Sequence, residues 1–160
     1  SRDRVVVLDD AVDYESVDVD WGEVVGLWPD DSVDVEALIA RVSALPHLTA
    51  MRKADVPERL RYSDNDRIPP VVVLVETGWT ATAQARLDRR SGWPSGGGHG
   101  FDSAHPDMHG LFLARGPRFR TSARIDSLHT VDVYGILTAA LGLDASPTAG
   151  DPAAVGRVLR

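Results

Sequence analysis

Histidines are the residues of this 160-residue chain with the clearest chemical potential, because three of the five lie within eleven positions. An imidazole binds metal ions or transfers protons near neutral pH. His105 and His109 are four apart, the spacing of two side chains on one face of a helix. Pro106 disfavours a helical conformation at His105, and no glutamate separates the pair as in helical zinc motifs. The sequence therefore gives weak support to a joint His105–His109 metal site.

His99 stands in a different setting, between Gly98 and Gly100. It lies near the end of residues 91–100, where five glycines in ten positions exclude regular structure and predict a loop. Glycines on both sides allow the backbone to approach a ligand closely and to adopt a positive φ without strain. Such an imidazole suits metal binding or acid/base work, but an exposed loop histidine without function has the same local sequence. From the residues alone, both interpretations stay open.

Charge is distributed unevenly along the chain, whose net charge is −7. The first 36 residues hold twelve acidic side chains and two arginines, so the rest of the chain is positive by 3. The acidic run from Asp9 to Asp20 lacks the ordered ligands and central glycine of a calcium loop, and we interpret it as a solvated acidic face. The downstream arginines belong to the solvated surface or attract an anionic ligand. The acidic balance opposes nucleic-acid binding.

Strands interleaved with helices must position these side chains. Short apolar runs closed by turn residues predict strands over five ranges: 5–8, 23–28, 48–52, 71–75 and 111–114. The run at 71–75 consists of branched residues between prolines and Gly78, which is typical of a strand buried on both faces. Two strong helices for about five strands predict an α/β fold with a mixed sheet and flanking helices.

Capping residues mark the predicted helices. Asp34 as N-cap and Pro46 as stop enclose an apolar stripe that predicts a helix from residue 35. Thr130 as N-cap and Gly142 after the last turn enclose a second helix. Three shorter features are also predicted: a single helical turn over 57–60, an irregular segment over 144–152 and a short helix over 153–159.

The composition is that of about one globular domain, with 43% hydrophobic residues and no cysteine. Disulfides and thiolate metal sites are therefore excluded, while the cellular compartment stays open. No run approaches the ~20 apolar residues of a membrane-spanning helix, and the N-terminal residues do not have the pattern of a secretory signal. We expect no membrane segment in this chain.

Several short motifs stand in the order in which one enzyme family carries them. Residues 57–62 read Pro-Glu-Arg-Leu-Arg-Tyr and are followed by Arg-Ile-Pro-Pro at 67–70. Residues 98–103 read Gly-His-Gly-Phe-Asp-Ser, and residues 108–119 read Met-His-Gly-Leu-Phe-Leu-Ala-Arg-Gly-Pro-Arg-Phe. Over roughly residues 4–150, the chain resembles the C-terminal part of the catalytic domain of the nucleotide pyrophosphatase/phosphodiesterase family, the type I phosphodiesterases of the alkaline phosphatase superfamily.

The resemblance implies an alkaline-phosphatase-like α/β core in which two zinc ions and a threonine nucleophile hydrolyse phosphodiester or pyrophosphate bonds. In this scheme His99 occupies the position of a zinc ligand. Asp102 occupies the position of a family aspartate, which either holds the loop through hydrogen bonds or orients a ligand. Ser103 replaces the usual asparagine. By the same analogy, the intact protein acts on a phosphate ester or nucleotide and is exported to the periplasm or the extracellular space.

The family's nucleophile and its other metal ligands precede the region that corresponds to residue 1, so the resemblance implies no catalytic residue in this chain. A catalytic zinc typically needs three protein ligands, and His99 supplies one. We therefore expect the isolated chain to be inactive, not to retain zinc, and to have the missing N-terminal part of the catalytic domain as its partner. The alternative is a self-sufficient, non-catalytic module that binds a partner through its acidic face or its glycine-rich loop.

We expect residues 1–160 to form a single domain with four parts. These are a lobe of strands and helices over 1–80, a glycine-rich loop over 81–98, the metal-ligand loop with a strand and a helix over 99–143, and a tail over 144–160. Strands that are covered in the complete family domain are left with free edges or faces in this chain. We therefore also expect a homo-oligomer.

Overall fold

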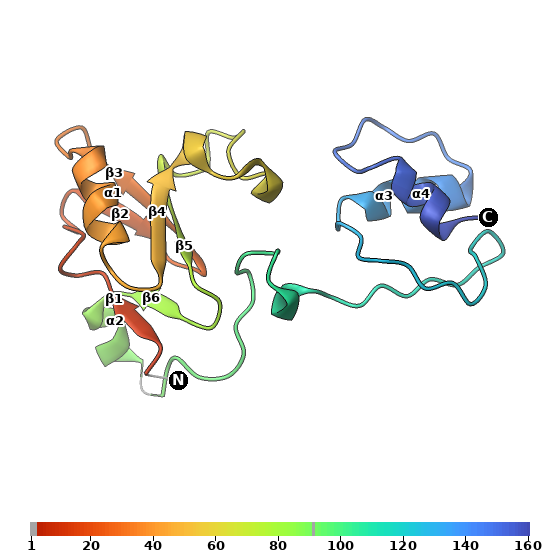
Figure 1. Cartoon of the computed structure of the whole chain (residues 1–160). Coiled ribbons are helices and arrows are strands. Elements are labelled where there is room, and N and C mark those ends of the chain that lie inside the picture. Colours follow the sequence, from red (N-terminus) through yellow and green to blue (C-terminus); the bar gives the residue numbers. More distant parts are fainter. Residues whose placement is uncertain (1–2, 91) are drawn as a thin grey trace. The chain divides into compact units, whose positions relative to one another are not determined.

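The computed structural model describes residues 3–90 and 92–160 (Figure 1). The chain divides into two compact units, Ser1–Gly110 and Leu111–Arg160, which we call the first and the second unit. Each unit has a hydrophobic core of its own. The sequence predicts one domain with four consecutive segments, whereas these units are separate compact bodies. The four segments therefore stay predictions. No helix in the described ranges is long and apolar enough to cross a bilayer.

The first unit contains two sheets. The larger one is antiparallel throughout, with four strands in the order β2 (Val17–Asp20), β3 (Val24–Pro29), β5 (Val71–Val75) and β4 (Leu48–Arg52). The smaller one pairs β1 (Val5–Val7) in parallel with β6 (Thr80–Thr82). Helix α1 (Val35–Ser43) packs against β4, and α2 (Gln84–Arg89) follows β6 directly (Figure 1). Helices combined with strands of both pairing directions confirm the predicted mixed α/β class.

Strand β5 lies between β3 and β4 and is buried on both faces, as its branched residues predict. Its odd-numbered residues join the main core together with Leu38 and Val42 of α1. Val72 joins a smaller cluster with Val56 and Ile68. Successive side chains of a strand alternate between its faces, so these two clusters cover opposite sides of the sheet. The segment between β4 and β5 thus forms the second cover.

Helix α1 begins where its cap predicts. The carboxylate of Asp34 accepts a hydrogen bond from the N–H of Ala37 at 3.1 Å. Leu38 and Val42 lie on one face of the helix and are fully buried. The helix ends at Ser43, shortly before the predicted stop at Pro46. Cap, apolar stripe and stop together place this helix over the main core.

Three elements of the first unit escape the sequence patterns. Strand β2 lies in the acidic run, where Val17 is buried while Asp18 and Asp20 are exposed. Its backbone is fixed by antiparallel pairing with β3 rather than by its composition. Strand β6 and helix α2 are also unpredicted, because a three-residue strand and a six-residue helix carry too few residues for a periodic signal.

Three short 3₁₀ turns complete the first unit: η1 (Lys53–Asp55), η2 (Glu58–Leu60) and η3 (Pro106–Met108). The turn η2 confirms the single helical turn predicted over 57–60. Residues 92–100 form the predicted irregular loop, while residue 91 of that prediction lies outside the described residues.

The second unit contains α3 (Asp132–Leu141) and α4 (Ala153–Val158), which pack against each other (Figure 1). Ile136, Ala154 and Val158 are the centre of its core. Both helices and the irregular segment over 144–152 are confirmed, and Gly142 ends α3 with a φ of +70°. The predicted N-cap at Thr130 is wrong. The cap is Val131, which makes no side-chain capping hydrogen bond, and the carboxylate of Asp132 at the start of the helix accepts the N–H groups of His129 and Asp151.

The predicted strand over 111–114 is also wrong. This segment has no hydrogen-bonded partner strand within the described chain, and Leu111 and Leu113 are 84% and 82% exposed. An extended segment becomes a stable strand only when its backbone N–H and C=O groups are paired. The apolar run is therefore strand-compatible in composition but unpaired here.

Candidate metal-ligand loop

His99 lies on an exposed loop of the first unit, residues 92–104, which we call the His99 loop. Gly100 adopts a φ of +97°, a conformation that favours glycine. A Cβ on Gly98 would lie 3.2 Å from the ring of Phe101 and 3.5 Å from Oε1 of Glu23. Phe101 itself packs against the main core. The glycines therefore allow the loop to pass close to Phe101 and Glu23 while the imidazole stays in solvent.

The His99 loop does not form a complete metal site with its surroundings. Within residues 3–90 and 92–160, no three His, Asp or Glu side chains gather as the ligands of a metal ion do. A zinc ion bound by protein typically has three or four such ligands. The residues present therefore do not fit a zinc centre by themselves, and the role of His99 as a ligand stays a prediction.

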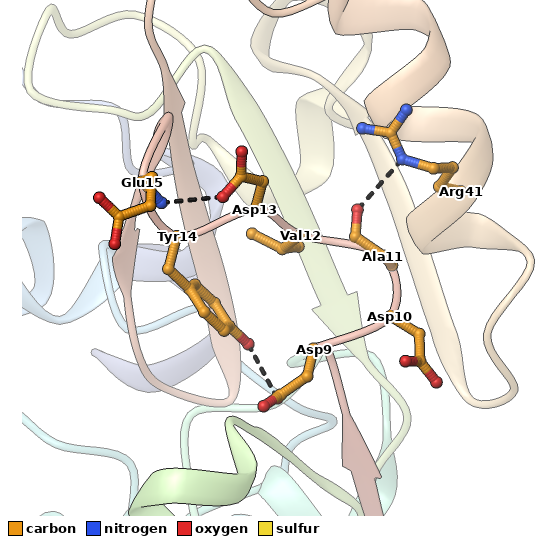
Figure 2. Close-up of a pocket in the computed structure, with 8 residues that line it drawn as sticks. All are labelled: Asp9, Asp10, Ala11, Val12, Asp13, Tyr14, Glu15 and Arg41. Carbon is orange, nitrogen blue, oxygen red and sulfur yellow. Dashed lines mark hydrogen bonds between the residues drawn. The ribbon is translucent and has the colours of Figure 1, made fainter.

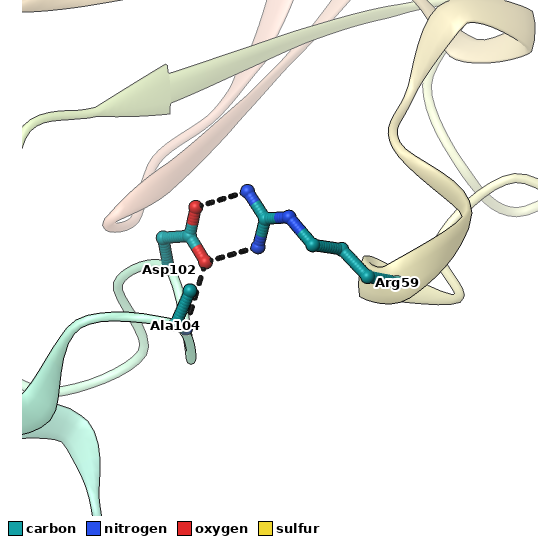
Figure 3. A network of polar contacts seen from close by, with 3 residues as sticks. All are labelled: Arg59, Asp102 and Ala104. Atoms are coloured by element: carbon teal, nitrogen blue, oxygen red, sulfur yellow. Dashed lines mark hydrogen bonds and ion pairs between the residues drawn. The ribbon is translucent and has the colours of Figure 1, made fainter.

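Asp102 is held by a two-point contact from outside the loop (Figure 3). Nη1 and Nη2 of Arg59 donate to Oδ1 and Oδ2 of Asp102 at 2.5 and 2.6 Å. Oδ1 also accepts the N–H of Ala104 at 2.9 Å. The hydrogen bonds from Arg59, and then the one from Ala104, lower the pKa of Asp102 to about 2. The carboxylate is therefore ionised, neutralised by a guanidinium and engaged through both of its oxygens.

Arg59 is the residue of this site that sequence reasoning missed. It belongs to η2, and the neighbouring Leu60 packs against the cluster beneath the sheet. The contact joins the Pro-Glu-Arg block to the Gly-His-Gly-Phe-Asp block. Arg59 and Asp102 are 43 positions apart in the sequence. No local spacing rule links such distant residues. The one available signal was that both blocks belong to the same family pattern.

The other two histidines of the group lie at the ends of η3. His105 is extended, as Pro106 predicts, and its Nδ1 accepts the N–H of Asp107 at 3.3 Å. His109 follows the turn with a φ of −75° and a ψ of 134°, which is also extended. The two side chains therefore do not share the face of an α-helix. Their spacing of four positions does not pair them as metal ligands in this way.

The acidic run surrounds a hollow of about 550 Å³ lined by eight residues: Asp9, Asp10, Ala11, Val12, Asp13, Tyr14, Glu15 and Arg41 (Figure 2). The hydroxyl of Tyr14 donates to Asp9 at 3.1 Å, and the backbone N–H of Gln84 donates to the same carboxylate. Burial, followed by the charge of Asp9, raises the pKa of Tyr14. Asp13 accepts the N–H of Glu15. These bonds fix the side chains of Asp9 and Asp13, and the interpretation of the run as a solvated acidic face stays a prediction.

Arginines of the second unit bind backbone carbonyls. Arg118 donates to the carbonyl of Ala139 at the end of α3, and Arg120 donates to the carbonyls of Gly156 and Leu159 around the end of α4. Cationic side chains beside the last carbonyls of a helix are stabilising, and the Ala139 carbonyl accepts the N–H of Gly142 as well. Both arginines therefore stabilise helix ends, a third role besides the surface charge and the anion site considered from the sequence.

Comparison with known proteins places these features in a family. The family model described as type I phosphodiesterase/nucleotide pyrophosphatase matches residues 1–102, a range that ends at Asp102 and includes His99. The chain is 34% identical over 151 residues to human ectonucleotide pyrophosphatase/phosphodiesterase family member 5, covering 94% of this chain and 31% of that protein. It is 30% identical over 152 residues to human bis(5'-adenosyl)-triphosphatase, again over 94% of this chain and 32% of the relative.

Solved structures agree over the whole chain. Murine ectonucleotide pyrophosphatase/phosphodiesterase 5 matches with a TM-score of 0.84 and 30% identity, covering 100% of this chain and 42% of that structure. An inactive variant of the murine protein in complex with AMP matches with the same TM-score and 32% identity. The chain thus spans about a third of the length of its curated relatives and has part of their alkaline-phosphatase-like fold. It belongs to the type I phosphodiesterase/nucleotide pyrophosphatase family.

Proposed function

We propose that this chain is the C-terminal segment of a zinc-dependent phosphodiesterase/nucleotide pyrophosphatase catalytic domain, to which it supplies His99 as a metal ligand. The observation that carries the proposal is the exposed imidazole of His99, presented between two glycines inside the region that matches the family. An exposed ring nitrogen is available to a metal ion held jointly with residues from elsewhere.

The remaining ligands and the nucleophile come, in this proposal, from a part of the domain that has no counterpart in this chain. The chain corresponds to 42% of the murine structure, which leaves the larger part of such a domain outside it. His99 alone offers one ligand where a catalytic zinc typically needs three. We therefore propose that the isolated chain neither retains zinc nor hydrolyses phosphodiesters.

The proposed substrate class is a phosphodiester or pyrophosphate such as a nucleotide. One relative is described as a bis(5'-adenosyl)-triphosphatase, and an inactive variant of the murine relative was solved in complex with AMP. Export to the periplasm or the extracellular space is part of the same proposal and rests on family analogy.

A chimera tests the role of His99. This chain replaces the matching segment of the murine relative, and hydrolysis of bis(p-nitrophenyl) phosphate is measured with and without Zn²⁺. We expect zinc-dependent turnover that His99→Ala reduces at least ~100-fold, since loss of a residue that merely supports a ligand already costs about 10–100-fold. His109→Ala is the matched control, because His109 is also exposed and lies ten residues further along the chain. This control is expected to keep full activity.

Two results contradict the proposal. Zinc-dependent turnover by the isolated chain removes the need for outside ligands, and full activity of the His99→Ala chimera removes His99 from the metal site. A folded chimera that is inactive with His99 intact favours the alternative, a non-catalytic interaction module.

A further inference from the structure

The contact between Arg59 and Asp102 fixes an orientation as well as a distance. A planar guanidinium that meets both carboxylate oxygens restricts rotation of both groups, which a lysine ammonium does not do. Arg59 and Asp102 are 49% and 30% exposed, so the pair lies at the surface beside the His99 loop. It attaches the His99 loop to η2 at Asp102, which lies three positions after His99 (Figure 3).

This attachment matters because the loop has few others near His99. Gly96 and Gly100 adopt φ values of +88° and +97°, and glycines lose much conformational entropy when a loop becomes ordered. His99 itself makes no hydrogen bond or ion pair within the described residues. Its position therefore depends on the residues that follow, Phe101 against the main core and Asp102 on Arg59.

The base of the attachment is held by packing and by backbone hydrogen bonds. The turn η2 follows Val56, which is buried, and its last residue, Leu60, packs against the cluster beneath the sheet. The N–H of Leu60 donates to the carbonyl of Pro57 at 2.9 Å. On the loop side, the N–H of His105 donates to the carbonyl of Asp102 at 3.0 Å and closes a turn after it. Arg59 therefore connects two locally ordered turns.

The same contacts give Asp102 a positioning role rather than that of a cation ligand. Arg59 donates to both of its oxygens and the N–H of Ala104 donates to Oδ1, while His105 is the other titratable group that acts on its charge. A carboxylate that is already neutralised has little to offer a metal ion. We infer that Arg59 is a positioning residue, which sets the conformation of the His99 loop through Asp102. This inference rests on the proposed role of His99.

Amide hydrogen exchange of the full chain tests the contact without any metal. We expect Arg59→Ala to speed exchange of the Ala104 N–H about 10-fold and Arg59→Lys to speed it less, because lysine keeps the charge but not the two-point contact. The carboxyl of Asp102, followed by NMR, titrates near pH 2 in the parent and shifts upward toward 3.8 in Arg59→Ala. Arg52→Ala, which breaks the exposed ion pair with Glu36 elsewhere in the first unit, is the control and leaves both readouts unchanged.

The chimera described above separates this inference from the proposed function. With Arg59→Ala we expect kcat/KM to fall about 10–100-fold, with partial recovery in Arg59→Lys and no change in Arg52→Ala. Full activity of Arg59→Ala in an active chimera overturns the inference and leaves the role of His99 standing. If the parent chimera is inactive, the proposed function fails, and unchanged Ala104 exchange and Asp102 titration in Arg59→Ala then overturn the contact on their own. Unchanged protection of the β5 amides shows that each variant is folded.

Discussion

Asp132 connects two loop segments of the second unit through its buried carboxylate. The residue is 4% exposed, and its two carboxylate oxygens accept the N–H groups of His129 at 3.0 Å and Asp151 at 2.8 Å. A Cβ on Gly150 would lie 2.7 Å from the carbonyl oxygen of Val131, so the loop before α4 passes directly over the start of α3. One carboxylate thus connects the two segments that enter the two helices.

Replacing Asp132 therefore removes two hydrogen bonds from a buried position. We expect Asp132→Ala to lower the free energy of unfolding of the second unit by about 1–3 kcal/mol, because two loop N–H groups lose their acceptor. Urea titration followed by the amide signals of α3 measures this. Asp144→Asn, an exposed aspartate on the irregular segment, is the control and is expected to have no effect. Equal stability of both variants would show that water replaces the carboxylate without cost.

The same carboxylate predicts a pH dependence. The hydrogen bond from the N–H of Asp151 is the main cause that lowers the pKa of Asp132 below its ordinary value of 3.8. A group whose pKa is lower in the folded state stabilises that state above its unfolded pKa, and the contribution is lost as the pH falls through the folded pKa. Stability of the second unit should therefore be constant above about pH 5 and decline below pH 4. In Asp132→Asn this part of the decline is absent, as urea titrations at pH 3 and pH 6 will show.

At the scale of elements, Gly26 explains how β3 fits beneath the prolines that precede β5. A Cβ at this position would lie 2.3 Å from Cγ and 3.2 Å from Cβ of Pro69, whose ring is closed onto the backbone and has little freedom to move away. We expect Gly26→Ala to destabilise the first unit by about 1–3 kcal/mol, the usual cost of overpacking. Gly156→Ala in α4 meets no atom within 4 Å and is expected to be neutral or slightly stabilising. Thermal unfolding measures the melting temperature of each variant. Equal melting temperatures for Gly26→Ala and Gly156→Ala would contradict the predicted clash with Pro69.

Elements whose signals are complete in the local sequence could be predicted. Helix α1 has its cap at Asp34 and its buried stripe, and β5 has an apolar run that follows two prolines and precedes Gly78. Strand β2 could not be predicted, because its aspartates mask a short alternation that only pairing with β3 stabilises. The segment 111–114 has the composition of a strand but lacks a partner in the described chain. Pairing is a property of two segments, and a single-segment pattern does not contain it.

The candidate site divides in the same way. The placement of His99 on a glycine-rich loop could be predicted, because the flanking glycines are local in the sequence. Its assignment as a metal ligand came from the family resemblance. The partner of Asp102 was not readable, because Arg59 lies 43 positions away and no spacing rule covers that separation. The arginine contacts to Ala139 and Leu159 are hidden for the same reason.

At the scale of the whole molecule, the exposed apolar residues are the feature that needs an explanation. Five leucines of the second unit are more than half exposed: Leu111, Leu113, Leu137, Leu141 and Leu143. Leu111 and Leu113 project from an extended segment whose backbone groups have no partner strand in the described ranges. Apolar side chains beside unpaired backbone are a surface on which another strand can add.

We therefore expect the chain to associate with itself through segment 111–114 at about 100 µM. Exposed strand edges and apolar surface promote association at such concentrations. The variant Leu111→Lys/Leu113→Lys should shift the species seen by sedimentation equilibrium toward the monomer, because charges on an edge oppose pairing. Ser127→Lys/Ala145→Lys adds the same charge at exposed positions outside the segment and should leave the distribution unchanged. A parent chain that stays monomeric at this concentration would contradict the expectation. Equal dissociation by both double variants would assign the effect to net charge instead of to this segment.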